Sequence, residues 1–275
     1  MVNNSLIAAS QDQIILVDKQ GQKKEISLEP IKGPINIIKV ASVYPNYIYV
    51  IRGPDWTLEV YDISKHTMIW KMFVGRGFGN VFYDPSNNVA YITTDDSLRA
   101  FDNLSGKLLW KMDEGIFPRG VFFEEDVLYI PEQTSLENAF RLADIDAATQ
   151  KKLWEKDIVR RPNYKGSKRT IIDDLLIFSG YGMIAIDKSN GEKVWEINGV
   201  GEDFSTVPVE FDGVIYTMGI ASSTVFAISF NDGSLIGTAN LESDSLIGRS
   251  FESIYSLKDG IVFNARNAVV IYKTK

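Results

Sequence analysis

An internal repeat of about forty residues constrains the fold of this chain more than any other feature. The stretch from Leu98 to Trp110 matches the stretch from Met183 to Trp195 almost position by position. In four copies an Asp stands eight residues before a Trp, as Asp62 and Trp70, Asp102 and Trp110, Asp146 and Trp154, and Asp187 and Trp195.

Weaker copies extend the repeat toward both ends of the sequence. The position of the Asp recurs at 18, 62, 102, 146, 187, 229 and 273, with Asp18, Ser229 and Lys273 at the weaker positions. The intervals stay between 40 and 44 residues. Seven copies in register predict one continuous array, and therefore a single domain over residues 1–275.

Each copy has the pattern of short strands joined by turns. A Val-x-Tyr-like strand precedes each alternating segment that leads to the Asp, and pairs such as Ser105-Gly106 and Asn190-Gly191 mark the turns. We expect an all-β fold, a single β-propeller of four-stranded antiparallel blades. The terminal copies supply three strands each, which gives seven blades, or six if one terminal segment forms no blade of its own.

The motif Ala-x-Asp-x-x-x-Gly-x-x-x-Trp, complete at Ala100–Trp110 and Ala185–Trp195, resembles the quinoprotein-type (PQQ-like) propeller repeat. This repeat is shared by quinone-dependent dehydrogenases, outer-membrane assembly lipoproteins, sensor domains and uncharacterised proteins. The resemblance implies architecture more than activity. The dehydrogenases are much longer and often carry a vicinal cysteine pair, and the lipoproteins need a leader and a lipidated cysteine. This chain has no cysteine, so we expect neither role and no cofactor.

The repeated residues are expected to serve the blades. Trp70, Trp110, Trp154 and Trp195 share one position, where each would pack against the neighbouring blade. Asp62, Asp102, Asp146 and Asp187 begin the turn after the third strand, where a carboxylate can accept hydrogen bonds from backbone N–H groups. A residue that recurs in every blade supports the blade and does not form a single active site.

Composition excludes several chemistries. The only histidine, His66, lies at the turn position that Gly106 occupies in its own copy, so a Ser-His-Asp triad, a Cys-His pair and a multi-histidine metal site are not expected. The net charge of −7 disfavours nucleic acid and anionic membranes as partners. No catalytic residue and no metal site is predicted.

Paired acids keep an enzymatic alternative open. Asp95-Asp96, Glu124-Glu125-Asp126 and Asp173-Asp174 are placed in or beside turns, and we expect them to be scattered and solvated. A convergent pair inside the channel, such as Asp203 with Glu210 or Glu252, would instead suit cleavage of a glycan.

Two segments break the repeat, and such breaks are where function is often added. They are the connection 131–138 and the blade junction 160–169, which holds five basic residues in ten. Both emerge on the same face of a propeller. Together with Phe78 and Phe204, the following residues are predicted to form a basic and aromatic rim for a partner: Trp56, Arg76, Phe117, Arg119, Arg160, Arg161, Lys168, Arg169 and Arg249.

These features favour a non-catalytic binding platform for a protein or peptide partner, with the loop face at the channel mouth as the contact. The alternative is a channel site, an enzyme or a binder of an anionic ligand or glycan, that uses carboxylates and arginines. Quinone binding is a third hypothesis, which predicts quenching of Trp fluorescence by the cofactor. The first residues show no signal peptide, so a cytoplasmic location is expected unless a leader has been removed.

Overall fold

The structure is a computed structural model of the 275-residue chain. The residues it describes are 6–9, 13–17, 20–28, 38–53, 56–75, 77–113, 120–133, 139–159, 168–180, 182–198, 204, 206–219, 224–240, 251–257, 260–265 and 268–273. No helix among them has the length and apolar character needed to cross a membrane.

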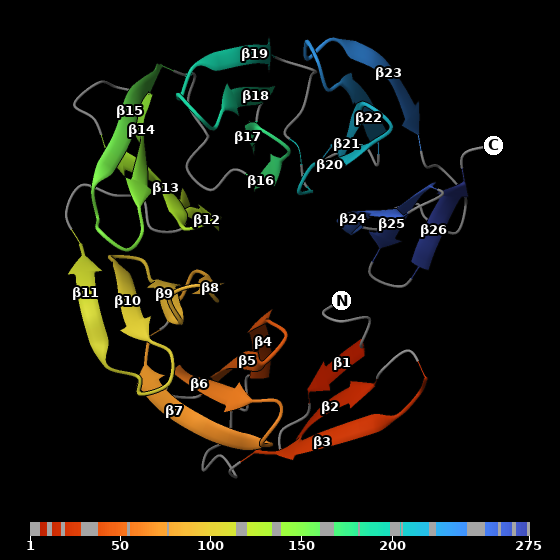
Figure 1. Cartoon of the computed structure of the whole chain (residues 1–275). Helices are drawn as coiled ribbons and strands as arrows, with labels where there is room; N and C mark the ends of the chain where they lie inside the picture. Colours follow the sequence, from red (N-terminus) through yellow and green to blue (C-terminus); the bar gives the residue numbers. More distant parts are fainter. Residues whose placement is uncertain are drawn as a thin grey trace. The chain divides into compact units, whose positions relative to one another are not determined.

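Seven antiparallel sheets make up the described chain, and the strands of each sheet follow one another in sequence (Figure 1). Five sheets have four strands, whereas β1–β3 and β24–β26 have three. The all-β prediction and the count of seven with two incomplete terminal sheets are therefore confirmed. This is the sheet arrangement of a seven-bladed β-propeller.

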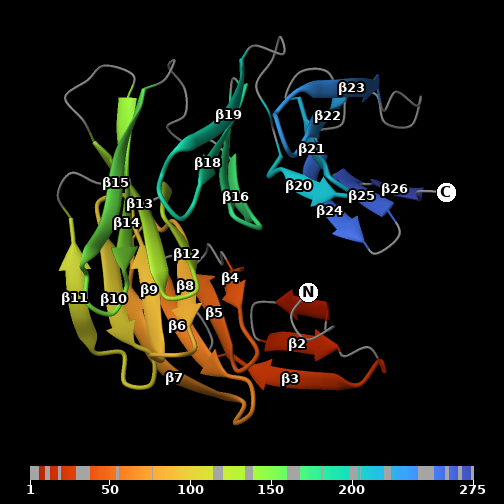
Figure 2. The ribbon, with the colours of Figure 1, turned by 45° about the horizontal axis from the view of Figure 1, so that its top comes forward.

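The strands of the first four sheets coincide with the repeat units. Figure 2 shows the neighbouring strands β4 to β11 along their length. The bounds are β1 Leu6–Ala9, β2 Gln13–Val17, β3 Lys23–Ser27, β4 Ile38–Val43, β5 Tyr47–Arg52, β6 Thr57–Asp62, β7 Thr67–Phe73, β8 Val81–Asp84, β9 Val89–Thr93, β10 Leu98–Asp102, β11 Leu108–Met112, β12 Phe122–Glu124, β13 Val127–Gln133, β14 Ala139–Asp146 and β15 Lys152–Val159.

The last three sheets repeat the same order. Their strands are β16 Lys168–Ile172, β17 Leu175–Ser179, β18 Gly182–Asp187, β19 Lys193–Asn198, β20 Val209–Phe211, β21 Val214–Met218, β22 Thr224–Ser229, β23 Leu235–Asn240, β24 Phe251–Leu257, β25 Gly260–Ala265 and β26 Ala268–Lys273. The first strand of the sixth sheet begins at Val209, and Thr206 before it accepts a hydrogen bond from the backbone N–H of Met218.

The contacts divide the chain into two compact units. One comprises Met1–Ile130 with Asp146–Gln150, and the other comprises Pro131–Ile145 with Lys151–Lys275. In the first unit, apolar side chains fill the spaces between sheets β1–β3 and β4–β7 and between β4–β7 and β8–β11. In the second, they fill the spaces between sheets β16–β19, β20–β23 and β24–β26. That the whole chain is one domain stays a prediction.

A β-bulge between the third and fourth strands explains the spacing of the motif. The register shifts by one residue in each of the five four-stranded sheets, for example between Ala185 and Ile186. This shift sets Trp195 directly opposite Ala185 and Trp110 opposite Ala100. The small Ala of the motif therefore leaves room on the sheet for the large indole of the neighbouring strand.

The indole of one sheet meets the turn of the next sheet. The Nε1–H groups of Trp70, Trp154 and Trp195 donate to the carbonyls of Asn103, Lys188 and Phe230 at 2.7, 3.1 and 2.9 Å. Each acceptor directly follows the Asp position of the next repeat unit. Because the ring is largely buried and its one donor is satisfied, this contact ties successive sheets together.

The glycine of the motif is required where this contact forms. Gly106 has a φ of 68°, and a Cβ added to it would lie 2.8 Å from the Cγ of Trp70. Gly191 and Gly233 are related to Trp154 and Trp195 in the same way. A side chain at these turns would therefore meet both an unfavourable backbone angle and the indole.

The Asp of the motif holds the same turn. The Asp102 Oδ1 accepts hydrogen bonds from the backbone N–H of Ser105 at 2.7 Å and from its hydroxyl at 2.6 Å. These bonds lower the pKa of Asp102. Equivalent bonds reach the remaining members of the set, Asp62, Asp146 and Asp187.

We expect Gly106→Ala to destabilise the fold more than Gly213→Ala. Gly213 has a φ of 75° but a Cβ there would meet nothing within 4 Å, so it reports the backbone effect alone. That effect costs about 1–2 kcal/mol, and displacing the indole adds about 1–3 kcal/mol. Urea unfolding of both variants measures the difference, and equal losses would show that the Trp70 ring gives way freely.

Candidate partner-binding residues

The structure describes five of the eleven predicted rim residues, namely Trp56 and Phe78 in the first unit and Lys168, Arg169 and Phe204 in the second. The other predicted rim residues lie outside the described residues: Arg76, Phe117, Arg119, Arg160, Arg161 and Arg249. That the eleven residues form one rim therefore stays a prediction.

Trp56 occupies the connection between the second and third strands of its sheet, as predicted. Its side chain is half-buried and packs against the apolar cluster between β4–β7 and β8–β11. Its φ is 53°, a left-handed conformation that a bulky side chain seldom adopts. Its carbonyl accepts a hydrogen bond from the backbone N–H of Val74 at 2.9 Å, which fixes the loop against the end of β7.

The junction after β7 lies against the hairpin between β9 and β10. The N–H of Gly79 donates to the carbonyl of Thr93 at 2.8 Å, and a Cβ on Gly77 would fall 2.4 Å from the Asp95 carboxylate. Phe78 is half-buried and packs against the same apolar cluster as Trp56. In the first unit, Gly77 beside Phe78 therefore lies against the exposed acid Asp95.

Lys168 and Arg169 begin β16, the first strand of its sheet. Lys168 is exposed, and the Ser179 hydroxyl donates to its carbonyl at 3.1 Å. Arg169 stands opposite Phe178 in the strand pair and is half-buried. Burial lowers the pKa of Arg169 to about 10, which means that its cation has lost part of its hydration.

Two expectations about the rim are corrected. Phe204 is only 3% exposed and packs edge-to-face on Phe226 with ring centroids 5.4 Å apart, so it cannot offer its ring to a partner. The connection placed at 131–138 begins later, because Pro131–Gln133 continues strand β13. The remaining residues, 134–138, lie outside the described residues.

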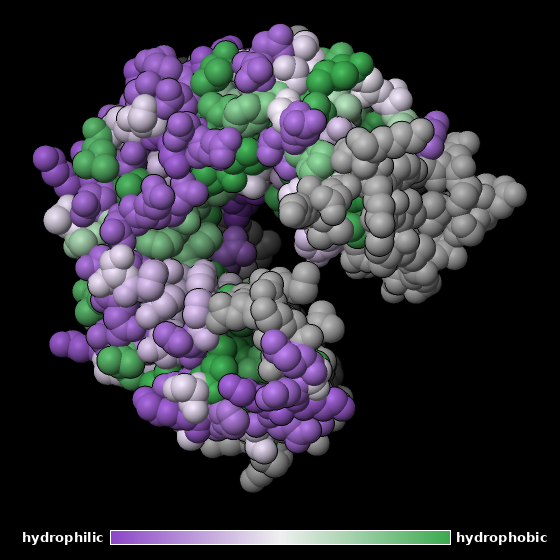
Figure 3. Space-filling view, turned by 45° about the vertical axis from the view of Figure 1, so that its right-hand side comes forward, coloured by the Kyte–Doolittle hydropathy of each residue, from purple (hydrophilic) through white to green (hydrophobic). Residues whose placement is uncertain are grey.

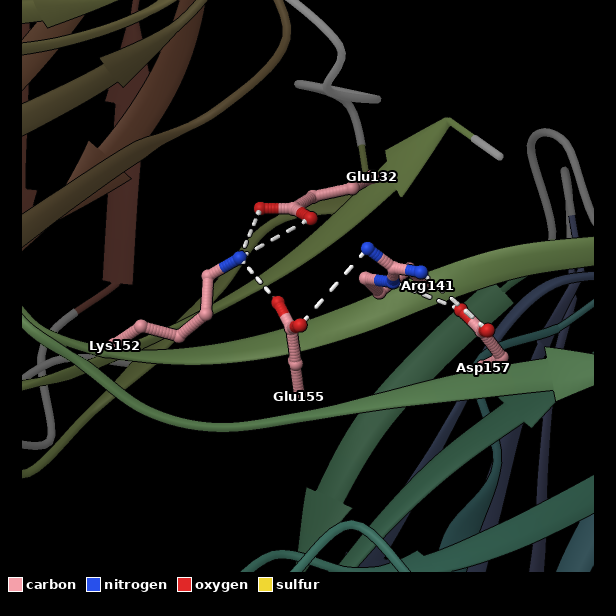
Figure 4. Close-up of polar contacts among 5 residues, drawn as sticks. All are labelled: Glu132, Arg141, Lys152, Glu155 and Asp157. Carbon is pink, nitrogen blue, oxygen red and sulfur yellow. Dashed lines mark hydrogen bonds and ion pairs between the residues drawn. The ribbon is translucent and has the colours of Figure 1, made fainter. Parts of the chain in front are cut away.

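An ion-pair network joins the last three strands of sheet β12–β15 (Figure 4). The Lys152 Nζ lies between Glu132 and Glu155, at 3.3 and 2.5 Å, and the Arg141 Nε contacts the Asp157 Oδ1 at 2.8 Å. Arg141 also approaches Glu155 at 3.9 Å. These cations are neutralised within their own sheet, and partly exposed pairs of this kind add little stability.

A buried charged cluster was missed in the sequence. Arg52 and Glu59 are 3% and 5% exposed, and the Arg52 Nη1 donates to both Glu59 carboxylate oxygens at 3.1 and 3.0 Å. The Tyr61 hydroxyl donates to the same carboxylate at 2.5 Å. The alternating strand pattern hides this pair, because Arg52 ends β5 and Glu59 stands where an apolar residue usually faces the core.

One of the paired acids, Asp126, has an acidic neighbour in the adjacent sheet. Removal from water and the adjacent Asp84 carboxylate raise the pKa of Asp126. Asp84 is fully buried and accepts hydrogen bonds from the N–H groups of Ser86 and Asn87. The first-to-second-strand turns of adjacent sheets therefore bring the two carboxyl groups together.

The acid pair considered for glycan cleavage consists of Asp203 with Glu210 or Glu252. The Glu210 Oε1 accepts the N–H of Gly213 at 2.7 Å and so caps its own turn. Asp203 and the side chain of Glu252 lie outside the described residues. His66 sits in the turn after β6 with a φ of 56°. The described part of the chain holds no group of three or more His, Cys, Asp or Glu side chains arranged for a metal ion.

The repeat unit, the seven antiparallel sheets and the indole-to-turn contact define a β-propeller of the quinoprotein type. A family model described as outer membrane protein assembly factor BamB matches residues 59–273, and the chain belongs to that family. The predicted resemblance is thereby confirmed. The matching model is named for the outer-membrane assembly proteins, whose role was not expected for this chain because it has no cysteine. What the match establishes is the shared repeat fold.

Solved structures agree on the fold. BamB from Moraxella catarrhalis is similar with a TM-score of 0.65 and 17% identity, over 99% of this chain and 82% of that one. The C-terminal WD40 domain of Sif2 is similar with a TM-score of 0.70 and 12% identity, over 98% of this chain and 78% of that one. Dihydro-heme d1 dehydrogenase NirN is similar with a TM-score of 0.72 and 11% identity, over 99% of this chain and 61% of that chain. No curated protein matches the sequence.

Breaking the buried pair is expected to be costly. Arg52→Met leaves Glu59 charged and buried, which should lower the free energy of unfolding by about 3–5 kcal/mol. The double variant Arg52→Met/Glu59→Leu should lose less than the sum of the two single variants. Urea unfolding of the four proteins gives the coupling energy, and simple additivity would mean that the two groups do not stabilise each other.

The pH dependence of stability should reveal the Asp84–Asp126 contact. Because the pKa of Asp126 is raised in the folded protein, the folded state loses stability as the pH rises above the unfolded value of about 3.9. Asp126→Asn should therefore raise the melting temperature at pH 7, and the gain should shrink toward pH 4. Asp173→Asn is the control for Asn in a left-handed turn. A gain that does not vary with pH would contradict the assignment.

Proposed function

We propose that the chain is a non-catalytic binding scaffold that recognises an acidic segment of a protein or peptide partner. The observation that carries the proposal is the pair Lys168 and Arg169 at the start of β16. Arg169 keeps its charge while burial lowers its pKa to about 10. A partly dehydrated guanidinium gains from a carboxylate partner, which offsets the hydration already lost.

The neighbouring residues support Lys168 and Arg169 as the contact for an acidic partner. Lys168 is exposed to solvent at the first position of β16. Lys168 and Arg169 also adjoin residues 160–167, which add two arginines and a lysine in sequence. An acidic segment would find here the largest concentration of positive charge in a chain of net charge −7.

The comparisons favour a scaffold at the level of the fold. The family is named for an assembly factor, and the WD40 domain is a propeller as well. NirN shows that the same fold also carries a dehydrogenase, so the fold alone does not decide between binding and catalysis. The choice of an acidic partner rests on the charge of Lys168 and Arg169 in β16.

The test compares two charge reversals of equal size. Lys168→Glu/Arg169→Glu alters the proposed contact, and Lys23→Glu/Lys24→Glu makes the same change on two adjacent exposed residues of β3. Each variant, immobilised at equal density, is used to capture proteins from the native extract, and near-ultraviolet circular dichroism checks folding. A captured protein should be depleted at least tenfold by the β16 reversal alone. Equal capture by wild type and both variants would reject the proposal.

A further inference from the structure

The fourth strand of the sixth sheet, β23, departs from the other fourth strands in two ways. Lys is present in the other fourth strands, β7, β11, β15 and β19, and in β3, the last strand of its three-stranded sheet. Glu is also present in β3, β15 and β19. Strand β23, Leu-Ile-Gly-Thr-Ala-Asn, has no charged residue. It also has Gly237 at the position that the other four-stranded sheets fill with Trp.

The edge of β23 is exposed. Among the described strands it pairs with β22 alone, and the side chains of Leu235 and Ile236 are 46% and 59% exposed. Exposed apolar residues are scattered over the surface in general, as the green areas among purple in Figure 3 show. The distinguishing feature of β23 is that no charge accompanies them, and charged residues are what usually keeps an edge strand from pairing with another chain.

Gly237 leaves a space on the face of this sheet. In the third sheet, the register aligns Tyr91, Ala100 and Trp110 in one row across three strands, and the two rings lie 5.7 Å apart. In the sixth sheet, the equivalent row is Tyr216, Ala227 and Gly237. A Cβ on Gly237 would meet no described atom within 4 Å, so this row lacks the side chain that Trp110 supplies in the third sheet and has space where that side chain would begin.

We propose that β23 is a strand-addition site for an extended, uncharged peptide segment of a partner, which inserts one aromatic side chain at Gly237. The backbone of the segment would pair with the edge of β23, and its ring would take the place beside Tyr216 that Trp110 holds beside Tyr91. Backbone hydrogen bonds would supply affinity and the niche would supply specificity.

The size of the edge points to a peptide instead of a second copy of this chain. Strand β23 has six residues, which span about 20 Å at roughly 3.4 Å per residue. A stable interface between folded proteins needs about 20–30 residues on each side. Six paired residues and one pocket suit a short segment, and the lack of charge on β23 suits an uncharged one.

The site is separate from the acidic-partner contact at Lys168 and Arg169. It lies on the last strand of a different sheet and offers no charge. The two proposals can therefore fail independently: Lys168→Glu/Arg169→Glu should leave binding at β23 unchanged, and substitution of Ile236 should leave the capture of an acidic partner unchanged.

The probe is a fluorescein-labelled blocked peptide, Thr-Val-Thr-Trp-Thr-Val-Thr, titrated with the full chain and followed by fluorescence anisotropy. Two variants address the site. Ile236→Lys adds the missing edge charge, and Gly237→Trp fills the niche. Val194→Lys is the matched control, because Val194 holds the same repeat position on β19 and is similarly exposed.

The proposal expects saturable binding that Ile236→Lys and Gly237→Trp each weaken at least tenfold, while Val194→Lys leaves it unchanged. Replacing the Trp of the peptide with Ala, or methylating alternate backbone amides, should weaken binding at least tenfold as well. Gly237→Trp should keep or raise the melting temperature, which separates a filled niche from a misfolded protein.

Three results would overturn the proposal. They are an absence of saturable binding, an equal loss with Val194→Lys, and binding that is insensitive to methylation of the peptide amides. Analytical ultracentrifugation tests whether a second copy of this chain binds the edge of β23 instead. A concentration-dependent dimer that Ile236→Lys abolishes would assign the edge to a second copy of this chain, and would likewise overturn the peptide proposal.

Discussion

The contact of a buried indole with the turn of the next sheet is the interaction on which the rest of this fold depends. Trp70, Trp154 and Trp195 each donate to a backbone carbonyl and lie beneath a glycine with a left-handed backbone. The residues of the motif therefore serve one contact, in which the Trp comes from one repeat unit and the turn from the next. Its Ala makes room for the indole, its Asp shapes the turn, and its Gly allows the turn to approach the ring.

Sites of interest appear where this contact is altered. At Trp110 the following unit has Gln150 at the glycine position, with a φ of 58°, and the indole lies against Tyr91 of its own sheet. At Gly237 the indole is missing. The repeat thus provides an internal reference, so that a departure can be identified from one sequence and its structure without any related sequence.

The sequence was sufficient to predict the fold because the repeat fixes strand order and turn position together. The offset of eight residues between Asp and Trp was visible, but the bulge that makes this offset necessary was not, since a register shift leaves no periodic signal. Phe204 was misplaced for a similar reason. A lone aromatic residue before a strand does not reveal whether its ring faces the core or the solvent. The Arg52–Glu59 pair was missed because its two members lie on different strands and only their pairing brings them together.

The indole-to-turn contact also has a direction. Trp70, Trp154 and Trp195 each donate to the unit that follows, and the unit that contains Lys188 and Trp195 both receives and gives this contact. A second copy of that unit would bring its own donor and its own acceptor. A chain built in this way can lengthen by whole units through gene duplication, while each copy stays free to diverge at the positions that the joint does not use.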